Sequence, residues 1–173
     1  MLEQELITSL KQNSTTAQKT AYHRYAGAVY ATARRYVTEM DAEEITSDVF
    51  LKVFGSMDQF TDTGTGSFWY WMKKITVNQC LMQLRRQKIS YDELDEQVIE
   101  ESSGDDQWKS WSIREIIEMI EKLPPGYRTV FNLYVLESMS HKEIAALLDI
   151  SEQTSKSQLH KARKLLQSHI KKV

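Results

Sequence analysis

Apolar residues recur every three to four positions over most of this chain, whereas the alternation typical of β-strands is nearly absent. Residues 41–57 show the pattern most clearly, with a stripe of Ile45, Val49, Val53 and Met57 that is widened by Phe50 and Phe54. Such spacing places apolar side chains on one face of an α-helix, which is buried against other helices. The chain is therefore expected to adopt an all-α fold.

Four helices are expected before residue 88, over residues 3–10, 17–37, 41–57 and 67–87. Asp41 is expected to cap the third helix, because a short polar side chain can accept a backbone N–H there. Small, turn-forming residues at 60–66 separate the third helix from the fourth. The inner side of the fourth helix is expected to carry Phe68, Trp71, Met72, Ile75 and Met82. Residues 1–87 are thus predicted to form one small helical domain.

The net charge of -2 conceals an uneven distribution of charge along the chain. Residues 88–107 contain eight acidic side chains and one basic one. Residues 1–87 contain nine acidic and ten basic side chains, and residues 108–173 contain seven acidic and eleven basic ones. The acidic block also contains Ser102-Ser103-Gly104 and shows little periodicity, which is typical of an unstructured segment. Residues 88–111 are therefore predicted to be a flexible acidic linker.

Residues 112–173 are predicted to form a second domain of four shorter helices. A Pro-Pro-Gly sequence at 124–126 separates the first two, because proline is tolerated at the start of a helix but not inside it. Ser140 and Ser151 are expected to cap the last two helices. Since only a brief turn at Asp149 joins these two, they must cross steeply, as in a helix-turn-helix. The last two helices are expected over residues 140–148 and 151–171.

The last helix is strongly basic, although the pI of the chain is about 6.1. Its inner seam is expected to consist of Ser155, Leu159, Ala162 and Leu166. The opposite face would carry Gln153, Lys156, Ser157, His160, Lys161 and Lys164. A helix of this kind fits a DNA major groove, where polar side chains reach base edges and lysines neutralise phosphates. The alternative is a solvated, lysine-rich helix face.

The fourth helix begins with a block of aromatic residues. Phe68 and Trp71 fall on the apolar stripe and are most simply core residues. Candidates for binding single-stranded nucleic acid lie off that stripe or at the basic end of the helix: Trp69, Tyr70, Lys73, Lys74, Arg85 and Arg86. Unpaired bases stack on aromatic rings while cations follow the phosphate backbone. Packing of Trp69 or Tyr70 against a neighbouring helix remains an alternative.

Several classes of function are disfavoured by what the sequence lacks. A single cysteine, Cys80, excludes an internal disulfide, and the four histidines lack metal-ligand spacing. The sequence contains neither a glycine-rich phosphate loop nor a recognisable nucleophile–base pair. No apolar run approaches the roughly 18 residues of a membrane span, and the N-terminus lacks the order of a signal peptide. We expect a cytosolic protein without membrane insertion, cofactor, metal or catalytic activity.

Four segments together resemble a known family: YHRYAGAVYATARRYV, DAEEITSDVFLKVF, GSFWYWMKKITVNQCLMQLRR and LPPGYRTVFNLYVLESMSHKEIAALLDISEQTSKSQLHKARKLL. They occur in the order found in bacterial RNA polymerase sigma factors of the sigma-70 family, of the small extracytoplasmic-function type. The resemblance covers about residues 20–88 and 112–168. It implies that the first domain corresponds to sigma region 2 and the second to sigma region 4, which together direct promoter-specific transcription initiation.

The resemblance also implies roles for individual residues. The second of the family's conserved helices binds a coiled coil on the polymerase β′ subunit, which here would use Ser47, Asp48, Leu51 and Lys52. The loop with Phe60, Asp62 and Thr63 would take up a base flipped from the minus 10 element, and Asn78 would face the same DNA. The basic face of the last helix would read the minus 35 element. The implied partners are the polymerase core, through its β′ coiled coil and β flap, promoter DNA and an anti-sigma factor.

The sequence departs from the family pattern at several positions. Asp149 stands where the turn usually has Gly, and Asp tolerates positive φ better than most residues. Ser155 replaces a usual inward Val, while Trp69 and Val77 stand where Arg is common. Two other functions fit the same helices: a helix-turn-helix transcriptional regulator with a sensory N-terminal bundle, and a helical sigma-binding regulatory protein. The former would bind duplex DNA without polymerase, and the latter would not contact DNA through Lys156 or Lys161.

Overall fold

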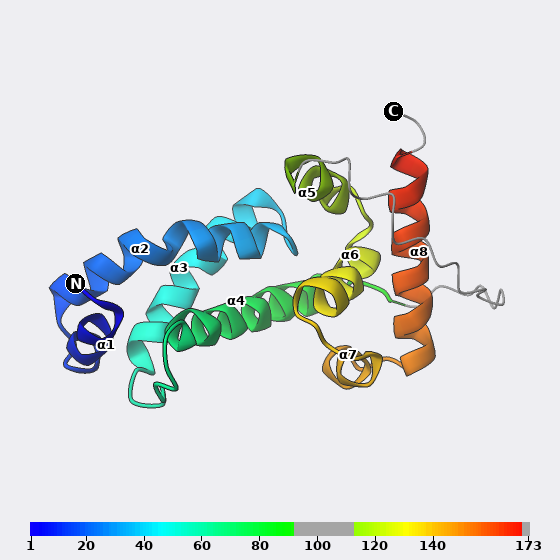
Figure 1. Ribbon diagram of the computed structural model, residues 1–173. Coiled ribbons are helices and arrows are strands. Elements are labelled where there is room, and N and C mark those ends of the chain that lie inside the picture. The colour runs from blue at the N-terminus through cyan, green and yellow to red at the C-terminus, as the bar shows by residue number, and fades with distance from the viewer. Residues whose placement is uncertain (92–112, 171–173) are drawn as a thin grey trace. The chain divides into compact units, whose positions relative to one another are not determined.

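A computed structural model describes residues 1–91 and 113–170, in which all regular secondary structure is helical (Figure 1). The expected all-α fold is therefore confirmed. The chain divides into two compact units, Met1–Gln87 and Lys88–Val173. The predicted linker, 88–111, lies outside the described residues except at its first four positions.

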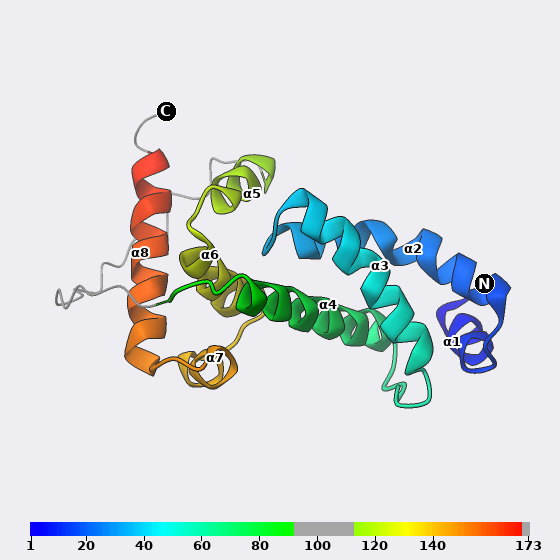
Figure 2. The ribbon, with the colours of Figure 1, turned by 180° about the vertical axis from the view of Figure 1, so that it is seen from behind.

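The first unit consists of four helices: α1 (Glu3–Lys11), α2 (Thr15–Arg34), α3 (Glu39–Gly55) and α4 (Ser67–Arg86). Helices α2, α3 and α4 pack on one another, and α1 packs on α2. The side chains of Val29, Val49, Phe68 and Met72 are fully buried between them. Figures 1 and 2 show α1 and the loop between α3 and α4 at the same end of this unit. The four-helix prediction for this part of the chain is thus confirmed.

Two details of the first unit differ from the sequence-based expectation. The N-cap of α3 is Thr38, whose hydroxyl accepts the backbone N–H of Asp41, so Asp41 lies in the first turn. The carboxylate of Asp41 instead accepts hydrogen bonds from the Thr38 hydroxyl and from the amides of Gln87 and Gln83, and these bonds lower its pKa. Met82, expected on the inner side of α4, is 41% exposed because it falls outside the contact with α2 and α3. Asp41 therefore joins the start of α3 to the end of α4.

The second unit consists of α5 (Ile113–Glu121), α6 (Pro125–Phe131), a π-helical segment η2 (Asn132–Leu136), α7 (His141–Leu148) and α8 (Glu152–Ile170). Pro125 occupies the first turn of α6, as expected from the Pro-Pro-Gly sequence. Helices α6 and α7 both pack on α8. Their contact buries the side chains of Val130, Ile144 and Leu166.

Residues 88–91 have no regular structure, and the last two of them lie against the second unit. The side chain of Gln158, which is 2% exposed, donates a hydrogen bond of 2.5 Å to the carbonyl of Tyr91. A Cβ at Gly126 would lie only 2.9 Å from the carbonyl oxygen of Ser90. The start of the segment predicted as linker is therefore packed between α6 and α8.

Candidate nucleic-acid interface

Helix α8 separates a buried seam from an outward polar face. Ser155, Leu159, Ala162 and Leu166 are all buried, as the sequence predicts. The six residues predicted to contact duplex DNA lie opposite this seam: Gln153, Lys156 and Lys164 are exposed, and Ser157, His160 and Lys161 are half-buried. One side of α8 therefore holds the helix on the second unit, and the other presents amide, hydroxyl, imidazole and ammonium groups.

The turn before α8 has the geometry of a helix-turn-helix. Asp149 ends α7 in the left-handed region, with φ 57° and ψ 50°, and its N–H donates to the carbonyl of Ala145. Ser140 caps α7 by accepting the N–H of Glu143, and Ser151 caps the start of α8 by accepting the N–H of Thr154. The predicted caps and the predicted positive φ at Asp149 are confirmed. Local capping thus fixes where both helices begin.

A polar contact inside this motif was not foreseen from the sequence. Nδ1 of His141, on α7, lies 2.9 Å from the hydroxyl of the fully buried Ser155 on α8. The imidazole also stacks on Tyr134 of η2, with ring centroids 4.6 Å apart. Desolvation, together with the nearby charges of Lys156 and Arg163, lowers the pKa of His141. The imidazole of His141 therefore joins three elements behind the outward face of α8.

The aromatic residues at the start of α4 fall into two groups. Phe68 is buried, as expected for a core residue, whereas Trp71 is half-buried and packs on Phe60 with ring centroids 5.1 Å apart. Tyr70 is 59% exposed, and the ammonium of Lys74 lies 4.7 Å from the centroid of its ring. The expected pairing of an outward aromatic ring with a cation is therefore present on α4.

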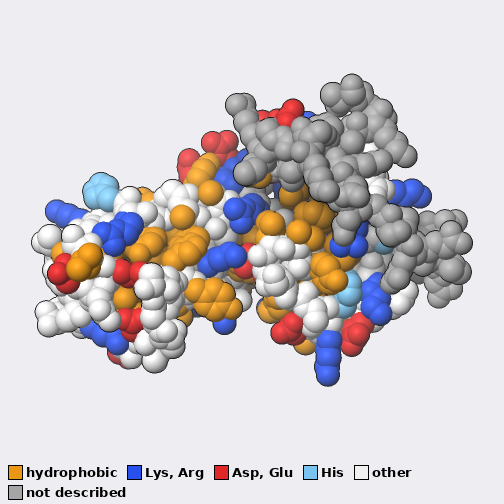
Figure 3. All heavy atoms as spheres, in the orientation of Figure 1, with side chains coloured by type: hydrophobic (Ala, Val, Ile, Leu, Met, Phe, Trp, Pro, Cys, Tyr) orange, Lys and Arg blue, Asp and Glu red, His pale blue; other side chains and the backbone are white. Residues whose placement is uncertain are grey.

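Trp69 is half-buried beside Tyr25 of α2, a residue that the sequence did not single out. The two rings are nearly parallel, with an interplanar angle of 3° and centroids 6.2 Å apart. Of the other α4 candidates, Lys73 is half-buried, whereas Asn78, Arg85 and Arg86 are exposed. Figure 3 shows Lys and Arg side chains lying among hydrophobic ones on one face of this unit.

The loop from Phe60 to Gly66 has a buried start and an exposed remainder. Phe60 is 3% exposed and its ring packs on Phe68 and Trp71, which anchors the start of the loop to α4. Asp62 and Thr63 are exposed. The backbone N–H of Gly64 and the hydroxyl of Ser67 both donate to Oδ1 of Asp62. These two hydrogen bonds lower the pKa of the Asp62 carboxyl, and the charge of Lys11 adds a smaller effect in the same direction.

The outer face of α3 carries the four residues expected to bind polymerase. Ser47, Asp48, Leu51 and Lys52 are all exposed. Leu51 is 71% exposed, although neighbouring Phe50 and Val53 are buried. A large apolar side chain thus stands in water between an acidic and a basic one.

Two features are absent from residues 1–91 and 113–170, a metal-binding cluster and a membrane-spanning helix. These residues contain no cluster of three or more His, Cys, Asp or Glu side chains suited to a metal ion. None of the helices in these two ranges combines the length and the apolar content needed to span a bilayer.

Comparison with known proteins matches two parts of the chain to one family. Residues 21–89 match the family model of sigma-70 region 2, and residues 113–166 match that of sigma-70 region 4. The ECF RNA polymerase sigma-E factor of Escherichia coli (strain K12) is 26% identical over an alignment of 183 positions, which covers 98% of this chain and 95% of the relative. The protein of the same name from Haemophilus influenzae is 25% identical, with coverage of 98% and 96%.

The fold also resembles a solved structure, that of CnrH in complex with the cytosolic domain of CnrY. The TM-score is 0.51 at 20% identity, and the match covers 96% of this chain and 95% of CnrH. The region 2 match falls on α2 to α4 and the region 4 match on α5 to α8, in the family's order. The chain therefore belongs to the sigma-70 family and is an RNA polymerase sigma factor of the extracytoplasmic-function (ECF) type, which directs promoter-specific transcription initiation.

Proposed function

We propose that the two units engage one promoter in two different ways. The second unit reads the duplex minus 35 element through the outward face of α8, and the first unit opens the minus 10 element and holds its unpaired strand. The observation that carries this proposal is the division of α8 into a fully buried seam and a basic outward face. The protein acts by binding and positioning DNA in the cytosol, without a catalytic step of its own.

Helix α8 suits a major groove in both size and chemistry. Its 19 residues span about 28 Å at 1.5 Å per residue, and a major groove admits one α-helix. Gln153 and Ser157 have side chains that donate and accept hydrogen bonds at base edges. Lys156, Lys161 and Lys164 neutralise phosphates, so binding through this face weakens as salt rises.

Helix α4 suits an unpaired strand. Tyr70 offers an exposed ring for stacking, which contributes about 1–3 kcal/mol per base, and Lys74 beside it can follow the backbone. Asn78, Arg85 and Arg86 extend the polar surface along the helix. The exposed loop with Asp62 and Thr63 receives the flipped base, while buried Phe60 supports it. Flipping costs a few kcal/mol of unstacking, which stacking and hydrogen bonds to the loop offset.

The outer face of α3 suits a protein partner. The exposed side chain of Leu51 gains from burial at an interface, and Asp48 and Lys52 supply charges of both signs around it. We assign this face to the β′ coiled coil of polymerase, and the second unit to the β flap. Because CnrH was solved with the cytosolic domain of CnrY, we also propose that a partner protein of the anti-sigma kind sequesters this chain.

In vitro transcription with core polymerase over a randomised promoter library tests the proposal. Selected promoters should share two sequence blocks, and Lys156→Ala should reduce selection of the upstream block. Lys142→Ala, a change of an exposed lysine on α7, serves as the matched control. Specific duplex binding without polymerase would instead favour the helix-turn-helix regulator. A chain that neither joins the core enzyme nor crosslinks to DNA through Lys161 would favour the sigma-binding regulator.

A further inference from the structure

Helix α1 contacts the loop 60–66 at both of its ends. At the start of the loop, Nζ of Lys11 donates a hydrogen bond of 3.0 Å to the carbonyl of Phe60 and lies 5.9 Å from the centroid of its ring. At the end of the loop, the N–H of Gly66 donates to Oε2 of Glu3 at 3.3 Å. The two α1 side chains therefore hold the two ends of the loop 60–66, the second of which leads directly into α4.

Between these points the loop is ordered by its own polar groups. Oδ1 of Asp62 accepts from the N–H of Gly64 at 3.0 Å and from the hydroxyl of Ser67 at 2.9 Å. Gly64 and Gly66 have φ of 122° and 82°, which side-chain-bearing residues rarely adopt. Every residue from Thr61 to Gly66 is exposed, so no apolar burial fixes their conformation. Contacts from outside the loop therefore have a large influence on its shape.

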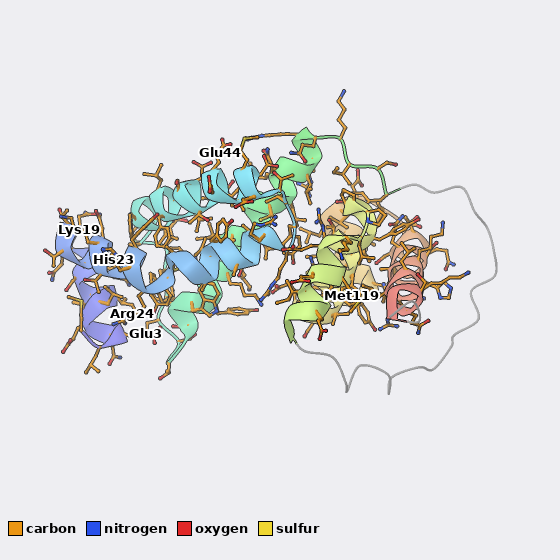
Figure 4. The ribbon with its side chains drawn as sticks, turned by 90° about the horizontal axis from the view of Figure 1, so that it is seen from above. Glu3, Lys19, His23, Arg24, Glu44 and Met119 are labelled. Atoms are coloured by element: carbon orange, nitrogen blue, oxygen red, sulfur yellow. The ribbon has the colours of Figure 1, made fainter. Side chains whose placement is uncertain are left out.

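Helix α1 is itself firmly placed on the first unit. Leu6, Ile7 and Leu10 are buried, and the guanidinium of Arg24 on α2 donates a 2.7 Å hydrogen bond to the carbonyl of Met1. Figure 4 shows Glu3 and Arg24 at the same end of this unit. The family match for region 2 begins only at residue 21, so α1 lies outside it. Glu3 and Lys11 thus reach the loop from a packed helix that lies outside the residues matched to region 2.

We propose that Glu3 and Lys11 are positioning residues that set the shape of loop 60–66 and thereby its selectivity for the unpaired promoter base. This inference rests on the proposed role of the loop in receiving a minus 10 base. Base discrimination requires donors and acceptors held at fixed positions, and the two α1 contacts restrict the loop at its entry and exit. The charge of Lys11 also makes a small contribution to the lowered pKa of Asp62, behind the hydrogen bonds from Gly64 and Ser67.

The first measurement tests the contacts themselves, by amide hydrogen exchange of the full-length protein without DNA. Lys11→Met removes the ammonium but keeps the aliphatic stem, and Glu3→Ala removes the acceptor for Gly66. Each should speed exchange of the loop amides about fivefold, since each deletes one hydrogen bond to a charged but solvent-accessible group. Lys19→Met, on the exposed side of α2, and Gln4→Ala, in the first turn of α1, are matched controls that should leave the loop unchanged.

The second measurement tests selectivity with the assembled holoenzyme. Single-stranded minus 10 oligonucleotides carrying each of the four bases at each position are compared for affinity. At one position, Lys11→Met and Glu3→Ala should each reduce the ratio of affinities between the best and the worst base about threefold to fivefold. Their affinity for core polymerase should be unchanged.

The outcomes separate this inference from the proposed function. Faster loop exchange together with reduced discrimination in both variants, and in neither control, supports the role of α1. Loop exchange no faster than in the controls overturns it and leaves the proposed function standing. If the variants show faster loop exchange but the wild-type holoenzyme does not discriminate among bases, the proposed role of the loop is overturned, and the inference fails with it.

Discussion

The hydrogen bond between His141 and Ser155 gives a test of how the helix-turn-helix is held together. Its two atoms are 2.9 Å apart, and Ser155 is fully buried. Ser155→Ala deletes a bond with a net contribution of about 1 kcal/mol, offset by the roughly 0.5 kcal/mol higher helix propensity of alanine. The single variant should therefore lose only about 0.5 kcal/mol of unfolding free energy. The coupling between the two side chains is the more informative quantity.

A double-mutant cycle isolates that coupling. Unfolding free energies are measured for wild type, Ser155→Ala, His141→Ala and the double variant, with urea unfolding followed by the NMR signals of α8. Signals from α8 report the second unit alone, whereas circular dichroism would average over both units. We expect a coupling of about 1 kcal/mol at neutral pH. A value within about 0.3 kcal/mol of zero would show that the contact does not stabilise the motif.

The imidazole of His141 also makes the second unit sensitive to acid. The pKa of His141 is lowered from its ordinary value of 6.5 by desolvation and by the charges of Lys156 and Arg163, against a smaller opposing effect of Glu152. The unfolded chain therefore binds a proton more readily than the folded one, so stability falls as pH drops below about 6.5. His141→Ala should reduce this part of the pH dependence. An identical pH dependence in wild type and variant would refute the assignment.

Four further predictions concern single positions. Gly126→Ala should destabilise the second unit by about 1–3 kcal/mol, because its Cβ would lie 2.9 Å from the carbonyl of Ser90. Gly27→Ala, with nothing within 4 Å, should instead stabilise the first unit by about 0.5–1 kcal/mol, and urea unfolding distinguishes the two signs. Asp149→Gly should raise the stability of the second unit by at most about 1 kcal/mol. Glycine relieves the left-handed strain at this position, but its greater conformational entropy in the unfolded chain offsets part of the gain. A loss of stability would contradict this. Cys80 is buried, and desolvation raises its pKa to about 12, so a thiol reagent should modify it only after unfolding; rapid labelling of the native protein would disprove this.

The parts of the fold that the sequence predicts well are those fixed by neighbouring residues. Ser140 and Ser151 cap their helices because each needs only a backbone N–H three positions ahead. Asp149 adopts positive φ because so short a turn requires it. Where two capping residues compete, as Thr38 and Asp41 do, the sequence-based prediction of Asp41 is wrong. Thr38 is the cap, and the carboxylate of Asp41 instead accepts the side-chain amides of Gln83 on α4 and of Gln87 just after it.

The candidate site was less accessible to sequence reasoning because its geometry depends on residues far apart in the chain. The outward face of α8 follows from helical period alone. The pairing of Lys11 with Phe60 spans 49 positions and that of Glu3 with Gly66 spans 63, and no local pattern indicates either. The stacking of Tyr25 on Trp69 is likewise a contact between two helices. Helical period shows that Trp69 lies off the core stripe but not which ring it meets.

The packing of Ser90 and Tyr91 against α6 and α8 bears on where this protein can be cut for separate study. A fragment that starts at residue 113, where the region 4 match begins, would discard the carbonyl that accepts the Gln158 side chain. It would also uncover Gly126. The buried side-chain amide of Gln158 would lose its hydrogen-bond acceptor, which costs about 1–3 kcal/mol of unfolding free energy. A fragment that starts at Lys88 keeps Ser90 and Tyr91 in place. The region matched by homology, which starts at residue 113, is therefore shorter than the compact unit, which starts at Lys88.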